Sequence, residues 1–339
     1  MDYRHKLMRG TVSAVTNKAL HDIRNDPKRS IRNLADLGEL FSTSATQRHF
    51  FSLARGILKN PANPYNELLV KMTKNVNLDS VRTLSVNFGY TVLSYGAELL
   101  RRHQLELNRR IPWLIIFDLK ETGGKRISLQ QISAYITDAI ALGIYTFIFM
   151  ADQPSDMDSI FRICDLFTEC VFFVACSSDM MMEDNVETTR TKSNLIVSLD
   201  ATSYFITDHI AQAFHRLRND GCFFGFHAIY SDENIPRLTS DEFTHQMIKE
   251  GCLIGTYVNQ NARLEELENR VYSFACKKRG KNGEPLFAMD FYRDISYVGK
   301  SISCGNYMMI RSDGTVPGYQ KNLNGMSLPD LMKTGAALY

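Results

Sequence analysis

The sequence predicts an α/β protein in which a helical N-terminal segment precedes a partial barrel of parallel strands. Between about residues 11 and 108, apolar residues recur at three- and four-residue spacing, which is typical of helices. After Pro112, six short apolar runs alternate with helical segments, and strands joined by crossover helices form parallel sheets. With 339 residues, 44% of them hydrophobic, the chain can bury the core of one large domain or of two ordinary ones.

The N-terminal segment, residues 1–110, is expected to be all-helical. Its expected helices cover residues 30–43, 45–60, 64–76 and 81–110. Two arginine pairs, Arg101 with Arg102 and Arg109 with Arg110, flank the last of these helices. They form either a solvated helix face or a docking patch for an acidic partner, and they are our candidates for a partner interface.

The alternating pattern occupies residues 111–260. Strands are expected at 113–118, 145–150, 171–176, 194–199, 223–230 and 253–258. Helices are expected at 128–142, 156–168, 180–190, 204–220 and 240–250. Six such units are enough for a partial (β/α)6 barrel.

Ligands of parallel α/β folds bind at the carboxyl ends of the strands, so polar residues at these ends are candidate binding residues. They are Asp118, Asp152, Gln153, Ser177, Ser198, Asp200 and His227. The three aspartates could bind a cation or an amine, or they could cap helices. His227 is either an interior histidine with satisfied hydrogen bonds or a general base.

Residues 261–339 depart from the repeated pattern. They predict a helix, a turn that contains glycine, and a β-hairpin around Asp313 and Gly314. We therefore expect a small C-terminal lobe here and not a seventh strand–helix unit.

Composition and spacing argue against several other classes of site. The seven cysteines show no CxxC spacing and several lie in apolar runs, which predicts core packing in a reducing compartment. The eight histidines lack metal-binding spacing, and "TGGKRIS" (122–128) departs from the phosphate-loop pattern, with Ser128 expected as a helix N-cap. A net charge of +2 and the lack of any ~18-residue apolar stretch predict neither nucleic-acid nor membrane binding, so we expect a cytoplasmic protein.

The layout of these elements carries a family resemblance. Residues 111–339 resemble the radical S-adenosylmethionine (SAM) enzymes, in the branch with a helical N-terminal extension and a cysteine-bearing C-terminal extension of the SPASM type. The stretches that carry it are "ISLQQISAYITDAIALGIYTFIFM", "CSSDM", "NLIVSLD", "GFHAIYSDENIPRLTSDEFTHQMIKEGC" and "DFYRDISYVGKSISCGNYMMIRSDGTVPGYQ". In that family, a CxxxCxxC loop after the first strand ligates a [4Fe–4S] cluster, and a Gly-Gly-Glu-Pro turn after the second strand holds the amino group of SAM.

The residues that carry this chemistry are replaced in this chain. "LKETGGKRIS" follows the first strand without any cysteine, and Ala151-Asp152-Gln153-Pro154 stands in place of the Gly-Gly-Glu-Pro turn. In the extension, Ser301 and Tyr319 stand where the resemblance places cysteines. Because the cluster needs thiolate ligands, the resemblance implies a radical-SAM-like fold with no cofactor.

The resulting hypothesis is a catalytically inactive radical-SAM-like protein. It would act as a partner subunit or a substrate-holding protein for an active enzyme, for example in a biosynthetic or peptide-modification pathway. The expected partner is an intact radical SAM relative or its substrate, or a second copy of the chain. The alternative is a repurposed enzyme or small-molecule binder that uses the old barrel cavity without a cluster.

Overall fold

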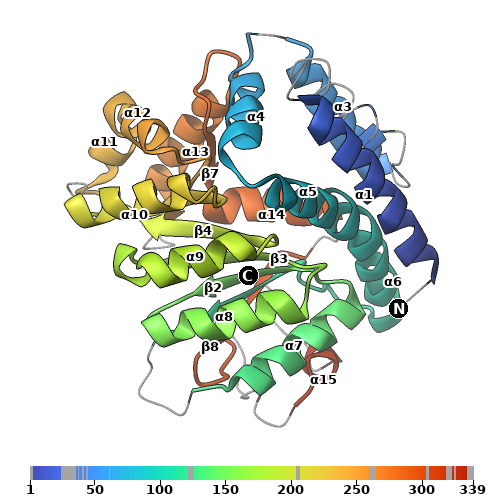
Figure 1. The fold of residues 1–339 in the computed structure, drawn as a ribbon. Coiled ribbons are helices and arrows are strands. Elements are labelled where there is room, and N and C mark those ends of the chain that lie inside the picture. Colours follow the sequence, from blue (N-terminus) through green and yellow to red (C-terminus); the bar gives the residue numbers. More distant parts are fainter. Residues whose placement is uncertain are drawn as a thin grey trace.

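The protein folds around one curled sheet of eight parallel strands (Figure 1). The computed structural model describes residues 3–23, 36, 38–39, 42, 45–60, 62–120, 126–203, 207–259, 265–302, 305–317, 323 and 326–333. The strands are β1 (Leu114–Asp118), β2 (Thr146–Met150), β3 (Val171–Cys176), β4 (Leu195–Asp200), β5 (Phe224–Tyr230), β6 (Ile254–Asn259), β7 (Phe287–Asp290) and β8 (Tyr307–Arg311). Their order in the sheet is β7-β6-β5-β4-β3-β2-β1-β8.

The helices between the strands begin and end where the sequence signals them. They are α7 (Leu129–Leu142), α8 (Pro154–Leu166), α9 (Glu183–Thr191), α10 (Asp208–Asn219), α11 (Ile235–Leu238), α12 (Asp241–Glu250), α13 (Glu265–Arg279), α14 (Phe291–Ile302) and α15 (Leu328–Lys333). Ser128 caps α7 and forms a capping box with Gln131, which confirms the expected N-cap. Gly143 ends α7 with φ 101°, a conformation that favours glycine.

One face of the sheet packs against these helices and is buried. Phe117, Phe147, Phe149 and Phe172 stack on one another along it. Three further aromatic pairs join strands to helices on the same face: Phe224 with Phe214, Phe226 with Phe243, and Tyr257 with Phe274. Because side chains alternate along a strand, the residues between these aromatic residues point to the opposite face of the sheet. We call that opposite, concave face the inner face.

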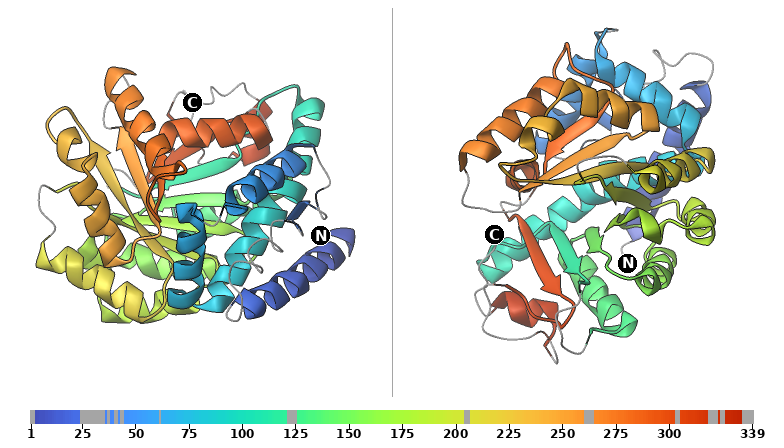
Figure 2. Two further views of the ribbon diagram at one scale, coloured as in Figure 1. Left: turned by 90° about the horizontal axis from the view of Figure 1, so that it is seen from above. Right: turned by 90° about the vertical axis from the view of Figure 1, so that its left-hand side faces the viewer.

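The predicted partial barrel is confirmed, with eight strands where the sequence predicted six. The six predicted strands are all present as β1 to β6. The predicted turn around Asp313 is present, and the Arg311 N–H donates to the Thr315 carbonyl across it at 2.9 Å, but no second strand follows among the described residues. β8 pairs with β1 in parallel, because Met308 and Ile310 are buried beside Ile115 and Phe117 (Figure 2). Since β7 and β8 extend the same sheet, the division into domains at residue 261 stays a prediction.

The N-terminal helices gather on one side of the molecule (Figure 1). They are α1 (Tyr3–Ile23), α3 (Ala45–Leu58), α4 (Pro64–Asn75), α5 (Leu78–Val86), the π-helix η1 (Asn87–Gly96) and α6 (Ala97–Leu107). The helix expected at 30–43 lies mostly outside the described residues. The remaining N-terminal segments are helical, as expected.

These helices contact the ends of the strands opposite the carboxyl ends. The Asn87 side chain is fully buried and donates to the carbonyls of Thr168 and Cys170, just before β3, while Arg9 of α1 donates to its oxygen. His5 of α1 hydrogen-bonds Glu169 at 2.9 Å. The π-helix thus starts at the residue that fastens the N-terminal helices to the barrel, and π-helical segments often mark such special positions.

Helix α14 spans the opening between the two end strands of the sheet. It contacts β6 and β7 on one side and β8 and α6 on the other. The indole of Trp113, just before β1, donates to the carbonyl of Ile295 in α14. A Cβ at Gly299 would meet the Trp113 ring at 3.1 Å and would come closer still to the Gly305 carbonyl, so the helix packs closely against this end of the barrel.

Candidate functional site

On β5 and β6 the inner face of the sheet is more accessible than the outer face, whereas Leu114 and Ile116 on the inner face of β1 are buried. On β5, Phe226 and Ala228 of the outer face are fully buried, whereas His227 and Ile229 of the inner face are half-buried. The same alternation holds on β6, where Tyr257 is buried and both of its neighbours are half-buried. Barrels that bind ligands present a partly exposed, largely apolar inner surface. In barrels that bind none, side chains fill the interior.

His227 and Ser198 form the polar centre of this face. They lie on adjacent strands β5 and β4, and the His227 Nδ1 atom is 3.1 Å from the backbone oxygen of Ser198 and 3.2 Å from its Oγ. Asp200 lies directly opposite His227 in the β4–β5 register. Burial lowers the pKa of His227, and the carboxylate of Asp200 and the backbone oxygen of Ser198 only partly offset this effect. The imidazole is therefore neutral at pH 7.

The remaining predicted residues lie around the carboxyl-terminal rim. Asp118 ends β1 half-buried, and its carboxylate accepts from the backbone N–H of the exposed Lys120. Asp152 and Ser177 are exposed, and Gln153 is half-buried. Of the seven predicted residues, the structure brings Ser198, Asp200 and His227 together. That these residues bind a ligand stays a prediction.

Two side chains that the sequence reasoning missed hold the turn after β2. Asp156 accepts from the backbone N–H groups of Asp152 and Gln153, both at 2.9 Å. Arg126, which precedes α7, pairs with Asp156 at 2.9 Å and also donates to the Leu119 carbonyl. An acidic residue three positions into a helix is a signal for capping and could have revealed Asp156. Nothing local could have revealed its pairing with Arg126, thirty positions away.

An iron–sulfur cluster does not fit the described residues. Five cysteines are buried in the core: Cys164, Cys170, Cys176, Cys222 and Cys252. Burial raises the pKa of Cys176, the one that ends a strand, to about 12, so this thiol is protonated at pH 7. In the part of the chain that the structure describes, no three His, Cys, Asp or Glu side chains gather as metal ligands would. Cys304 lies outside the described residues, as does the loop at 121–125.

The four arginines predicted as a partner interface differ in their surroundings. Arg101 is half-buried and donates to the Ile302 carbonyl at the end of α14, so it joins α6 to α14. Arg102 is exposed and lies 3.5 Å from Glu98, four residues earlier in the helix. Arg109 and Arg110 are exposed. Only the last three arginines are therefore available to a partner.

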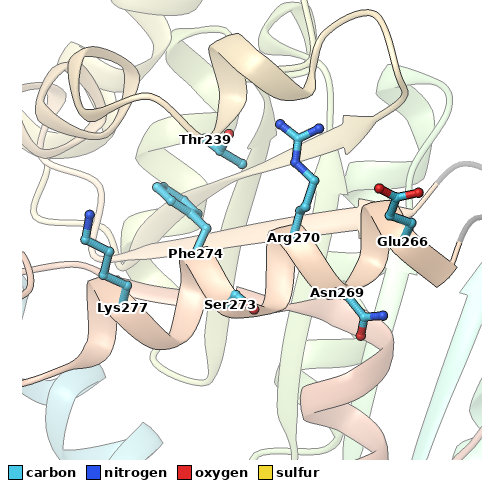
Figure 3. A pocket seen from close by; sticks show the side chains of 7 residues that line it. All are labelled: Thr239, Glu266, Asn269, Arg270, Ser273, Phe274 and Lys277. Carbon is cyan, nitrogen blue, oxygen red and sulfur yellow. The ribbon is translucent and has the colours of Figure 1, made fainter.

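A hollow on the surface lies away from the inner face. It has a volume of about 490 Å³ and follows α13 on the outer side of the barrel (Figure 3). Arg270, Phe274 and Lys277 line it together with Thr239, which precedes α12. Because Phe274 packs against Tyr257 of the outer face, this hollow belongs to the outer side of the barrel.

Among the described residues, no helix is long and apolar enough to cross a membrane. No protein-family model and no curated protein sequence matches the chain.

Solved structures of SuiB from Streptococcus suis share the fold. SuiB alone matches with a TM-score of 0.51 and 11% identity over 88% of this chain and 81% of SuiB. SuiB bound to the precursor peptide SuiA matches with 0.51 and 11% over 68% of this chain and 67% of SuiB. SuiB bound to S-adenosylmethionine gives 0.51 and 14% over 68% and 66%, so these two matches span about two thirds of SuiB. The likeness at this identity is one of fold, and the fold is a radical-SAM-like partial barrel.

Proposed function

We propose that this protein is a non-catalytic, peptide-holding relative of the radical-SAM-like fold that works beside an active enzyme. The observation that carries the proposal is the set of half-buried, mostly apolar inner-face side chains on β5 and β6, which the chain keeps although it has no cysteine in the loop after β1. A face retained without ligands for a cluster is suited to binding and not to radical chemistry.

The fold relation supports a peptide as the occupant. SuiB, which shares the barrel, has been solved with a precursor peptide bound. The accessible inner side chains include Met150, Phe173 and Met309, and such flexible or flat apolar groups accommodate varied peptide side chains. The proposed partner is an intact radical SAM relative or its substrate, with a second copy of this chain as the other possibility.

The test is photo-crosslinking from the inner face in the native host. p-Benzoylphenylalanine replaces Met150 on the inner face, and in the matched control it replaces Leu166, which is 64% exposed at the end of α8 on the outer side. We expect one peptide or protein species to crosslink from position 150 and not from position 166. Ala175→Trp, which fills the half-buried centre of β3, should abolish that crosslink, while Ser177→Trp at the exposed rim should not.

The second candidate, a small-molecule binder, is favoured by the polar centre of Ser198, His227 and Asp200. A metabolite that co-purifies with the wild-type protein and is lost from Ala175→Trp, with no crosslinked peptide, would replace the peptide proposal with this one.

A further inference from the structure

The hydrogen bonds of His227 determine which of its ring nitrogens carries the proton. Its Nδ1 atom lies 3.1 Å from the Ser198 carbonyl oxygen, which can only accept. A donor is therefore required at Nδ1, and the neutral ring must keep its lone pair on Nε2. The Ser198 hydroxyl oxygen, 3.2 Å from the same Nδ1, can accept from it as well.

The Nε2 atom of His227 is consequently an acceptor on the accessible side of the ring. Nδ1 faces the neighbouring strand β4, so Nε2 is directed away from that strand. Within the described part of the chain, Nε2 makes no hydrogen bond. A donor from a ligand would satisfy this acceptor.

Asp200 places a second acceptor on the same face of the sheet as the first. It stands opposite His227 in the register, and both side chains are on the inner face. One of its oxygens accepts from the Thr202 backbone N–H at 2.8 Å, and the other makes no hydrogen bond to any residue that the structure describes. A carboxylate oxygen next to a neutral imidazole nitrogen is complementary to a cation with at least two N–H donors.

The other charged groups near this centre come from β1, from the loop after it, and from α11, where Arg237 donates to the carbonyls of Ala201 and Thr202 directly after Asp200. Lys120 is close enough to lower the pKa of His227, and Asp118, whose carboxylate accepts from the Lys120 backbone, carries the opposite charge at the same rim position. Cys176 on β3 is a protonated thiol that faces the outer side. Asp200 is the acidic group that stands directly opposite His227.

We infer that His227 and Asp200 bind the side chain of an arginine in the held peptide. This inference rests on the proposed function. A guanidinium is planar and has five donors in a fixed fork, so it can donate to the imidazole nitrogen and to the carboxylate oxygen at once, while its methylene stem packs on the apolar surroundings. An ammonium lacks this fixed fork and fits the two acceptors less well.

Three short peptides test the inference by calorimetry and by NMR of the histidine Cε1–H signals. They are acetyl-Val-Arg-Val-amide, the same peptide with citrulline, which keeps the shape of arginine but not its charge, and the same peptide with norleucine. We expect the arginine peptide to bind at least about tenfold more tightly than the other two, since a charge-assisted hydrogen bond has this effect. It should also shift the Cε1–H signal of His227.

Two substitutions test the roles of the two ring nitrogens of His227 separately. His227→Asn keeps a donor near the Nδ1 position for the Ser198 carbonyl but removes the Nε2 acceptor, whereas His227→Gln places an amide oxygen near the Nε2 position. We expect His227→Asn and Asp200→Asn each to weaken the arginine peptide about tenfold or more, and His227→Gln to weaken it less than about threefold. Affinity in the wild-type protein should also fall with pH below the ordinary range of histidine, because a protonated Nε2 donates and repels the cation.

The outcomes distinguish this inference from the function on which it rests. Equal affinity for all three peptides, or equal losses in the Asn and Gln variants, overturns the arginine site while inner-face crosslinking can still succeed. Arginine binding at His227 without any crosslinked peptide in the host supports the site and overturns the peptide-holding function.

Discussion

Replacing Asp290 by asparagine should make the stability of this protein less dependent on pH. Asp290 ends β7 and is 1% exposed. It accepts hydrogen bonds from the Tyr230 hydroxyl at 3.1 Å and from the Arg293 backbone N–H at 3.0 Å. Burial raises its pKa from 3.8 to about 6, and the carboxylates of Glu268 and Asp294 add to the effect, against the two hydrogen bonds.

The direction of the pH effect follows from this shift. The folded protein holds the Asp290 proton more tightly than the unfolded chain does. The stabilisation that comes from the protonated Asp290 is therefore fully present below about pH 4 and is lost as the pH rises through about 6. The shift of about 2 units, at 1.36 kcal/mol each, corresponds to about 3 kcal/mol over the whole window.

The assay is urea unfolding at a series of pH values between about 4 and 8. In the variant, the asparagine oxygen can still accept from the Arg293 N–H and the asparagine amide can donate to the Tyr230 oxygen, so the network survives without a titrating group. Relative to the wild type, Asp290→Asn should become more stable by up to about 3 kcal/mol between about pH 4 and pH 7. Asp158→Asn, at an exposed position of α8, should show no such trend. A difference between wild type and Asp290→Asn that is constant across the window would refute the reasoning.

Four further outcomes are expected. Anaerobic reconstitution with iron and sulfide should yield no stoichiometric four-iron absorbance, and a reproducible signal of that kind would contradict the cofactor-free hypothesis. Calorimetry should find SAM binding weaker than about 100 µM, since the charge-assisted contact of a carboxylate is missing at Gln153; micromolar affinity would favour the repurposed enzyme. Arg126→Met should lower stability by about 1–3 kcal/mol in chemical denaturation, because it leaves the carboxylate of Asp156 without its cation; an unchanged midpoint would show that the two backbone N–H donors suffice. Arg109→Glu combined with Arg110→Glu should weaken co-purification with a partner without changing the melting temperature, since exposed substitutions usually cost under about 0.5 kcal/mol; a lone monomer in the wild type at every salt concentration would remove the basis for this interface.

The strands β1 to β6 could be predicted because their signal is local. Apolar runs of five to seven residues alternate with amphipathic helices, and caps such as Ser128 and Gly143 mark the boundaries. β8 could not be placed in the same way. Its sequence precedes an Asp-Gly pair, which locally favours a hairpin, but its partner β1 lies about 190 positions earlier in the chain. Only the burial of Met308 and Ile310 against β1 decides between the two pairings.

The candidate site shows the same division between local and distant information. Alternation and the carboxyl-end rule were sufficient to name Ser198, Asp200 and His227 as candidates. Which of them meet depends on the β4–β5 register, which the sequence does not encode locally. Likewise, Asn87 begins a π-helix because its side chain reaches two carbonyls before β3, a contact between residues more than eighty positions apart.

The strand order has a mechanical consequence. A closed barrel has its radius fixed by strand number and shear, because every strand is hydrogen-bonded on both sides. Here β7 and β8 are the ends of the sheet, and packing of α14 takes the place of an eighth ladder between them. This seam is held by close packing of Gly299 against Trp113 and by the hydrogen bond from the Trp113 indole to the Ile295 carbonyl of α14, and not by a ladder of backbone hydrogen bonds. The distance between the two end strands is therefore set by the position of a single helix, α14, and not by strand number and shear.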